Sequence, residues 1–304
     1  MTNDMDFLQR QTWPLVSAVA DYWCSRAIFN QTTKMYVING VVAPDEYTSD
    51  FDNGVNNSVY TNAVAKLNLD FAVKVARMLN VTPDAKWSTV RDALTILYDP
   101  KTDLHPEFEG YSGQTIKQAD VVLLGYPLMF PMSASTRLRD LTYYSNKTDV
   151  NGPSMTWSMT AIGFLEVGDH QLADTYFLRS FSDNVRPPFN AWAETINGGC
   201  PHFITGAGGF LQGVFGGYGG VRLHSDRVDI TPNLPSGTSF MKFRGFGYLG
   251  ASLDISWDAK NTFFVLNRQG QADLFVTDVQ TQKKTQLKLG VTVTLPNSQF
   301  SISE

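Results

Sequence analysis

Hydrophobic residues recur at helical spacing over roughly the first 218 positions of the chain, in segments separated by Pro, Gly and Asn. One face of the first segment carries Leu8, Trp13, Val16, Val19 and Trp23, which predicts a helix that runs to about position 29. Further helices are expected at 57–80, 86–97, 115–125, 134–146, 154–168, 171–183 and 203–216. About eight helices, several joined by short connections, favour a helical hairpin array or an α/α toroid over a four-helix bundle.

The pattern changes after Gly220, where apolar and polar residues alternate as they do in strands. Turn-forming sequences such as TPNLPSG, DAKN and RQGQ separate these segments. The expected strands are 221–223, 227–230, 239–243, 248–257, 261–267, 271–278, 283–288 and 291–295. Short strands at this spacing are typical of an antiparallel β-sandwich. The sequence therefore predicts a mainly α chain with a C-terminal β domain, helical over 1–219 and a small β-sandwich over 220–304.

One segment at this junction lacks charge altogether. From Thr195 to Val221 the chain has no Asp, Glu, Lys or Arg, and ten of its 27 residues are Gly. The favoured interpretation is a buried helix whose glycines let backbones pass closely. The alternative is a helix start and loop that line a ligand cavity.

Composition and charge exclude several classes of protein. The chain has 304 residues, 43% of them hydrophobic and 17% charged, which predicts a large core. Its net charge of −5 argues against binding to nucleic acid, which depends on Lys and Arg. The start MTNDMDFLQRQTW has no basic and apolar signal regions, so a cytoplasmic location is favoured. The longest apolar stretch, VVLLGYPLMFPM, is too short and too rich in proline for a membrane helix, so no membrane contact is expected.

The sequence carries few motifs of known chemistry. It has no P-loop, paired CxxC, HExxH or GxSxG, and its four His residues are scattered. Cys24 and Cys200 allow at most one disulfide and lack metal-ligand spacing. Carboxylates remain as the candidate chemistry.

Two carboxylates stand out by their surroundings. Glu46 lies in the loop VVAPDEYT, where a carboxylic acid above a helical scaffold is well placed for general-acid work, although Asp45 could merely cap a turn. Glu194, in PPFNAWAETINGG, is the last charged residue before the uncharged segment, so we expect it to be paired or functional. Glycoside hydrolysis needs such a pair of carboxyl groups. The faces of Trp13, Trp157 and Trp192 and the amide of Gln118 would suit sugar rings, although core packing is the commoner role of Trp.

Six stretches resemble glycoside hydrolase family 65, and especially its animal branch. They are VVAPDEYT, NNSVYTN, HPEFEGY, IKQADVVLLGYP, GPSMTWSM and FITGAGGFLQ. The likeness covers almost all of the first 218 residues in the same order and is weaker in the β region. It implies an (α/α)6 barrel followed by a small C-terminal β-sandwich.

The resemblance also implies roles for four residues. Glu46 of PDEY corresponds to the proton donor, and Lys117 and Gln118 of KQAD correspond to residues that contact the substrate sugar. Glu194 corresponds to the general base that activates water in the hydrolytic members. The implied reaction is inverting hydrolysis that releases glucose from the α-glucosyl-galactosyl-hydroxylysine unit of collagen, without a metal or organic cofactor. Trehalase-type and disaccharide-phosphorylase-type reactions of the same family are the alternatives.

The family's barrel has twelve helices, whereas this sequence predicts about eight. The family's N-terminal β-sandwich, linker and opening helices, with their Trp-Asp substrate-binding motif, have no counterpart here. We therefore expect a partial barrel with exposed apolar faces. Two hypotheses follow: a glycosidase whose sequence is incomplete, and a non-catalytic module that binds sugars or other proteins.

Overall fold

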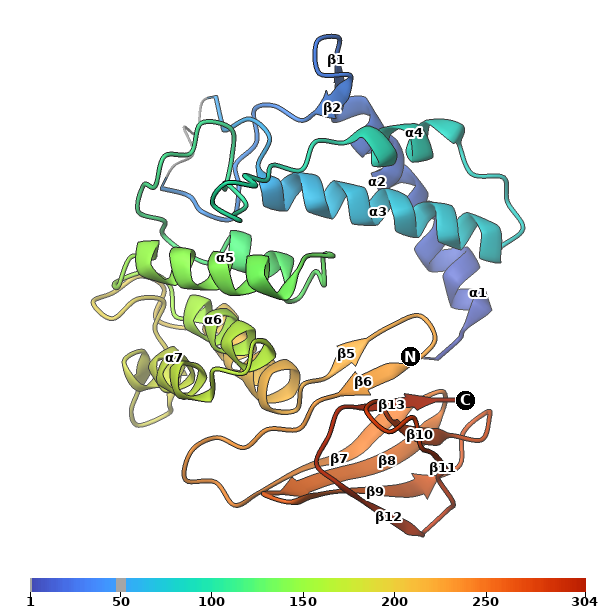
Figure 1. The fold of residues 1–304 in the computed structure, drawn as a ribbon. Coiled ribbons are helices and arrows are strands. Elements are labelled where there is room, and N and C mark those ends of the chain that lie inside the picture. The colour runs from blue at the N-terminus through green and yellow to red at the C-terminus, as the bar shows by residue number, and fades with distance from the viewer. Residues whose placement is uncertain (1, 48–52) are drawn as a thin grey trace.

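The helices of the chain form an open arc above a β part in the computed structural model, which describes residues 2–47 and 53–304 (Figure 1). A continuous helical backbone runs through α1 (Met5–Phe7), the π-helical segment η1 (Leu8–Thr12) and α2 (Trp13–Arg26). The other helices are α3 (Val59–Met78), α4 (Ala85–Ala93), α5 (Ala134–Lys147), α6 (Met155–Glu166), α7 (His170–Ser182) and α8 (Ile204–Gln212). A π-helical segment, η3 (Gly213–Tyr218), continues α8. Together they form a partial (α/α)6 barrel, as the sequence predicts.

Local sequence signals explain where these helices begin. Side chains of Ser58, Asp84, Ser133 and Asp169 accept hydrogen bonds from backbone amides in the first turns of α3, α4, α5 and α7. Such N-caps satisfy amides that have no partner within the helix.

The C-terminal part is an antiparallel β-sandwich of two sheets. One sheet has the order β11-β10-β13-β6-β5 and the other has the order β12-β9-β8-β7. The strands are β5 (Arg222–Leu223), β6 (Val228–Ile230), β7 (Phe240–Tyr248), β8 (Ala251–Asp258), β9 (Asn261–Arg268), β10 (Phe275–Asp278), β11 (Lys284–Gln286), β12 (Thr292–Pro296) and β13 (Phe300–Ser303). Every second residue of β8 is buried, and Leu253, Ile255, Phe264 and Phe300 lie within one apolar core. This alternation is the period of two that the sequence shows.

Two helix predictions were wrong in part. The first helix ends at Arg26 instead of position 29, because β1 (Ile28–Asn30) pairs with β2 (Met35–Val37) in a hairpin. The segment 115–125 forms only a short 3₁₀ helix, η2 (Val121–Leu124).

Side chains from distant segments explain the lost helix. The amide of Lys117 donates to Asp45 Oδ1 at 2.5 Å, and the amide of Ala119 donates to Thr156 Oγ1 at 3.1 Å. The amide of Ile116 donates to the carbonyl of Lys147 at 3.0 Å. Because these donors are used outside the segment, the local periodicity does not produce a helix.

The prediction of a buried, glycine-rich helix in the uncharged segment was right only in part, because Gly206 and Gly209 are the buried residues of α8. A Cβ atom at Gly209 of α8 would lie 3.0 Å from Met155 Cα, and one at Gly213 would lie 3.0 Å from the Phe177 ring. Glycine therefore allows α8 and η3 to approach α6 and α7 closely. The opposite side of α8 is open, since Ile204 and Leu211 are 83% and 65% exposed.

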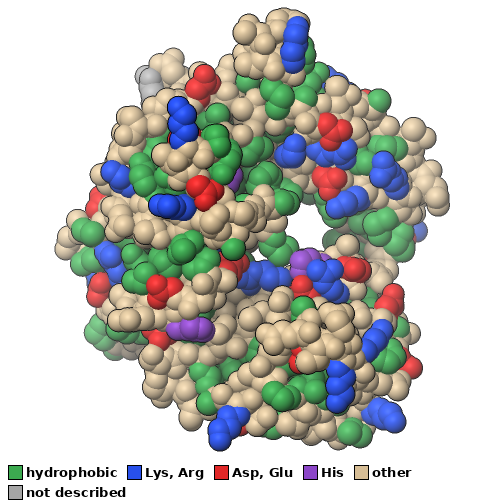
Figure 2. Space-filling model, in the orientation of Figure 1, with side chains coloured by type: hydrophobic (Ala, Val, Ile, Leu, Met, Phe, Trp, Pro, Cys, Tyr) green, Lys and Arg blue, Asp and Glu red, His purple; other side chains and the backbone are tan. Residues whose placement is uncertain are grey.

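An ion-pair cluster joins the helical part to the β part. Arg137 of α5 and Arg222 of β5 both donate to Glu166 of α6, at 2.7 and 2.6 Å. The Phe215 ring of η3 lies 5.6 Å from the Phe243 ring of β7. Space-filling atoms leave an opening between the helical arc and the β part (Figure 2).

A helix that crosses a membrane must be both long and apolar. None in the described part of the chain is both long and apolar enough to cross a bilayer.

Candidate active site

The PDEY loop and the KQAD segment meet through an ion pair. Lys117 Nζ donates to Glu46 Oε2 at 2.6 Å, and the two side chains are 22% and 45% exposed. This hydrogen bond raises the pKa of Lys117, and the charge of Glu46 adds to the rise. Two residues that were predicted separately are therefore in direct contact.

Asp45 holds these two segments together from below. Its side chain is fully buried, and its Oδ1 accepts from the amide of Lys117 at 2.5 Å and from the amide of Tyr47 at 3.3 Å. The amide of Asp45 donates to Asp120 Oδ2 at 3.2 Å. Asp45 therefore caps its own turn and also fixes the backbone of KQAD.

Gln118 also links the KQAD segment to the PDEY loop. Its Nε2 donates to the carbonyl of Pro44, and the side chain is partly buried. The amide thus orients the PDEY loop. A contact between Gln118 and a sugar remains a prediction.

Glu194 lies in a loop that wraps its carboxylate in backbone groups. Glu194 Oε2 accepts from the amide of Cys200 at 2.9 Å, and the amide of Glu194 donates to the carbonyl of Cys200 at 2.9 Å. Gly199 has φ +76°, and a Cβ atom there would lie 2.7 Å from Glu194 Oε2. Only glycine fits this position without strain. In the described part of the chain, the hydrogen bonds of Glu194 are thus made with backbone groups.

Lys117 connects the two predicted carboxylates. After the contribution of Glu46, the charge of Glu194 also raises the pKa of Lys117. Glu46 and Glu194 thus act on one ammonium group, although they are far apart in the sequence. The direct contact in this arrangement is the ion pair between Lys117 and Glu46.

A second layer of carboxyl groups lies beneath this surface, and the sequence analysis did not identify it as functional. Glu107 and Asp120 are both fully buried. Glu107 belongs to the loop HPEFEGY, where its carbonyl accepts from the amide of Val59 at 2.9 Å. Burial raises the pKa of Glu107 to about 10, with further contributions from Asp120 and Asp45. The sequence did contain one sign of this burial, because Glu107 is a charged residue placed directly between Pro106 and Phe108.

The tryptophans proposed for sugar binding are packing residues. Trp157 is 2% exposed, and its ring stacks on Tyr176 with the centroids 5.9 Å apart. The Trp13 ring lies edge-on to Trp87, and Trp192 packs against Phe210. The structure thus favours core packing for these three side chains.

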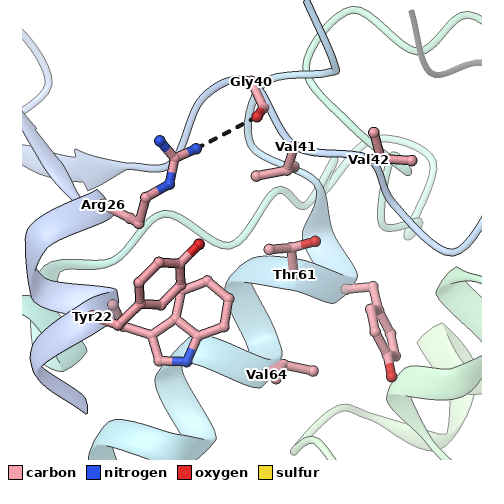
Figure 3. Close-up of a pocket in the computed structure, with 9 residues that line it drawn as sticks. Tyr22, Arg26, Gly40, Val41, Val42, Thr61 and Val64 are labelled. Atoms are coloured by element: carbon pink, nitrogen blue, oxygen red, sulfur yellow. Dashed lines mark hydrogen bonds between the residues drawn. The ribbon is translucent and has the colours of Figure 1, made fainter. Parts of the chain in front are cut away.

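Two cavities lie near the loops that carry Glu46 and Glu194, although neither is lined by these two side chains. One of about 460 Å³ lies between α2, the start of α3 and the loop that leads to Glu46 (Figure 3). Arg26 and Tyr22 both extend from α2 on one side of it, and Arg26 donates to the carbonyls of Asn39 and Gly40. The other, of about 450 Å³, lies beside the Glu194 loop and includes Phe189, which is 91% exposed.

A metal site in a protein needs several ligating side chains close together. Within residues 2–47 and 53–304, no group of three or more His, Cys, Asp or Glu side chains is arranged to hold a metal ion.

The chain is similar in sequence to part of several longer carbohydrate-active enzymes. Residues 1–113 match the glycosyl hydrolase family 65 central catalytic domain. The protein-glucosylgalactosylhydroxylysine glucosidase of Dictyostelium discoideum is 42% identical over 267 residues, which cover 87% of this chain and 37% of that protein. The corresponding protein of Danio rerio is 39% identical over 301 residues, 97% of this chain and 45% of that protein. The kojibiose hydrolase of Mucilaginibacter mallensis is 37% identical over 256 residues, 81% and 36% respectively. The chain thus spans less than half the length of these relatives.

A solved structure has the same fold. It is described as a kojibiose phosphorylase from the human microbiome, and it matches with a TM-score of 0.77 at 20% sequence identity. The match covers 97% of this chain and 47% of the other, so it includes both the helical arc and the β part.

Proposed function

Because the chain belongs to glycosyl hydrolase family 65, we propose that it carries the catalytic carboxyl groups of a glycosidase that releases glucose. Glu46 serves as the general acid and Glu194 as the general base. The observation that carries this proposal is the position of Lys117. Its ammonium group forms an ion pair with Glu46, and the charge of Glu194 helps to raise its pKa. Both carboxyl groups act electrostatically on the same ammonium group, which supports assigning them to one site.

The proposed reaction is a single displacement. Glu194 accepts a proton from a water molecule while the water oxygen forms a bond to the anomeric carbon of glucose. The bond from that carbon to the leaving oxygen breaks, and the leaving oxygen receives a proton from Glu46. Attack from the face opposite the leaving group inverts the configuration, so an α-glucoside yields β-glucose.

Lys117 prepares Glu46 for this step. The ion pair holds the Glu46 side chain at the rim in the absence of substrate, and the neighbouring Gln118 fixes the loop. A sugar hydroxyl that bonds to Lys117 would compete with Glu46 for its ammonium group, so substrate binding would free the Glu46 side chain to face the leaving oxygen.

We propose glucosyl-galactosyl-hydroxylysine as the substrate and kojibiose and trehalose as competing candidates. The support for the first comes from relatives with that activity in their names, at 39–44% identity over 80–97% of this chain. Kojibiose hydrolases and an acid trehalase are also relatives, at 35–37% and 30% identity.

The position of Glu194 favours water over phosphate as the nucleophile. A phosphate ion beside Glu194 would be repelled by its carboxylate, whereas water can donate a proton to it. A phosphorylase reaction is therefore the second candidate and has the weaker support.

The test measures glucose released from the three sugars by the unmutated chain, Glu46→Gln and Glu194→Gln. Each substitution is expected to reduce kcat by about 10²–10⁴-fold, because each removes one proton transfer. Asp226→Asn is the control, since this exposed carboxylate lies in the β part. NMR detection of β-glucose as the first product supports inversion. Activity that survives both Glu substitutions, or a glucose phosphate formed with added phosphate, would contradict these assignments.

A further inference from the structure

Glu107 is a fully buried acid that faces other acids. Its two carboxyl oxygens meet no hydrogen-bond donor in the described part of the chain. The group lies within hydrogen-bonding reach of the Asp45 side chain and close to Asp120. All three side chains are 0% exposed. An ionised carboxylate in such a place would lose its hydration without compensation.

Asp45 and Asp120 have backbone donors, whereas Glu107 has none. Asp45 Oδ1 accepts from two amides, those of Tyr47 and Lys117, and Asp120 Oδ2 accepts from the amide of Asp45. Two carboxyl groups in contact repel each other unless a proton lies between them. Burial also raises the pKa of Asp120, to about 7, but Asp120 Oδ2 accepts from a backbone amide. The proton is expected on Glu107, because neither of its oxygens has such a donor in the described part of the chain.

We propose that Glu107 is protonated at neutral pH and donates a hydrogen bond to Asp45, which makes it a positioning residue for the pair of Lys117 and Glu46. The chain of contacts has three steps. Glu107 orients the Asp45 carboxylate, Asp45 holds the Lys117 amide at 2.5 Å, and Lys117 Nζ holds Glu46 at 2.6 Å. The positioning role rests on the proposed function of Glu46, whereas the protonation of Glu107 does not.

The surroundings of the cluster support a shared proton. Besides the three acids, the titratable groups that interact with it include Tyr47, whose phenol donates to Asp149, and three buried or half-buried phenols, those of Tyr60, Tyr111 and Tyr144. All three phenols have a raised pKa, chiefly because they are buried. They are therefore neutral at neutral pH and do not offset the charge of the acids.

The main test compares Glu107→Gln with Glu109→Gln. Gln is neutral, has nearly the shape of a protonated Glu, and can donate to Asp45. Glu109 belongs to the same loop, but it is exposed and accepts from Asn57 Nδ2 at 2.9 Å, so it is the matched control.

The pH dependence of stability has a defined sign. The pKa of Glu107 is raised from 4.5 to about 10, so the folded chain keeps a proton that the unfolded chain loses above pH 4.5. The stability of the unmutated chain is therefore lost progressively from pH 4.5 towards pH 10. Glu107→Gln is expected to remove this loss, so its Tm should rise above that of the unmutated chain, increasingly from pH 5 to pH 9. Glu109→Gln is expected to show no such increase.

Infrared spectroscopy tests the proton directly. At pH 7 the unmutated chain should show a protonated-carboxyl C=O band that Glu107→Gln lacks and Glu109→Gln retains. Absence of that band, together with a lower Tm of Glu107→Gln at every pH, would overturn the proposal.

Activity tests the positioning role. Glu107→Gln should keep kcat and its pH profile, whereas Glu107→Ala should lower kcat about tenfold because Asp45 loses its donor. Equal losses in both variants would overturn the positioning role. If the unmutated chain releases no glucose, the proposed function fails, while the infrared band and the pH dependence of Tm still decide the protonation of Glu107.

Discussion

The β part of the molecule has an almost wholly apolar interior, whereas the helical part buries many polar side chains. Within the described residues, Asp229 and Thr262 are the buried polar side chains of the β part, and all others lie in the helical part. Those of the helical part include Asp45, Glu107 and Asp120 beneath the candidate site. Buried polar groups cost stability unless they are paired. Burial of polar groups therefore lowers the stability of the helical part more than that of the β part. The candidate site lies above three of these buried groups.

The largest effect on stability is expected from the apolar interior of the β part. Phe264→Ala should reduce the free energy of unfolding by about 3–5 kcal/mol, because it leaves a cavity in a fully buried core. Urea unfolding measures this loss. Phe240→Ala, which removes a ring that is 51% exposed, is the control and should cost far less. Equal losses in the free energy of unfolding would mean that side chains in the core of the β part stabilise it no more than those on its surface.

The ion-pair cluster that joins the helical part to the β part should have the next largest effect on stability. Arg137→Ala should cost about 3 kcal/mol, because it removes one partner of a buried pair while Arg222 still neutralises Glu166. Arg139→Ala on the same helix is the control, since that side chain is exposed. Thermal unfolding of both variants measures the difference. A loss below that of Arg139→Ala would show that the cluster does not stabilise the junction.

Helix packing provides a smaller effect with opposite signs at adjacent positions. Gly209→Ala should cost about 1–3 kcal/mol, because the new methyl group would lie 3.0 Å from Met155. Gly208→Ala has no atom within 4 Å of the new methyl group and should stabilise α8 by about 0.5–1 kcal/mol. Chemical unfolding of the two variants tests the close approach. The same sign in both would contradict the packing described for α8.

The smallest effect on stability is expected at the candidate site itself. Lys117→Met should change the free energy of unfolding by less than about 1 kcal/mol, because exposed ion pairs contribute little. It should still reduce glucose release strongly. Lys74→Met, which breaks an exposed pair with Asp70, is the control and should leave glucose release unchanged. A large loss of stability in Lys117→Met would assign the pair a structural role.

The sequence predicted best those elements whose signal is local. The alternation in β8 and the caps Ser58 and Asp84 depend on neighbouring residues, and these elements begin within a few residues of the predicted positions. The terminal strand β13 was missed, because FSIS is short and is defined by its pairing with β10 and β6.

Contacts between distant segments account for the parts that the sequence did not predict. The expected helix at 115–125 is absent because Asp45 and Thr156 accept its amides. Glu107 was not singled out, since its environment is made by residues that lie far from it in the sequence. Glu46 and Glu194 were singled out by their surroundings, and the family motifs gave roles to them and to Lys117 and Gln118. These roles remain predictions.

The backbone-held carboxylate of Glu194 has a consequence for how this site can change over evolutionary time. Every residue except proline supplies the same amide at position 200, so the side chain there is free to drift. The number of residues between 194 and 200 is not free, because an insertion would move that amide away from the carboxylate. The loop should therefore tolerate substitutions at position 200 and resist changes in its length.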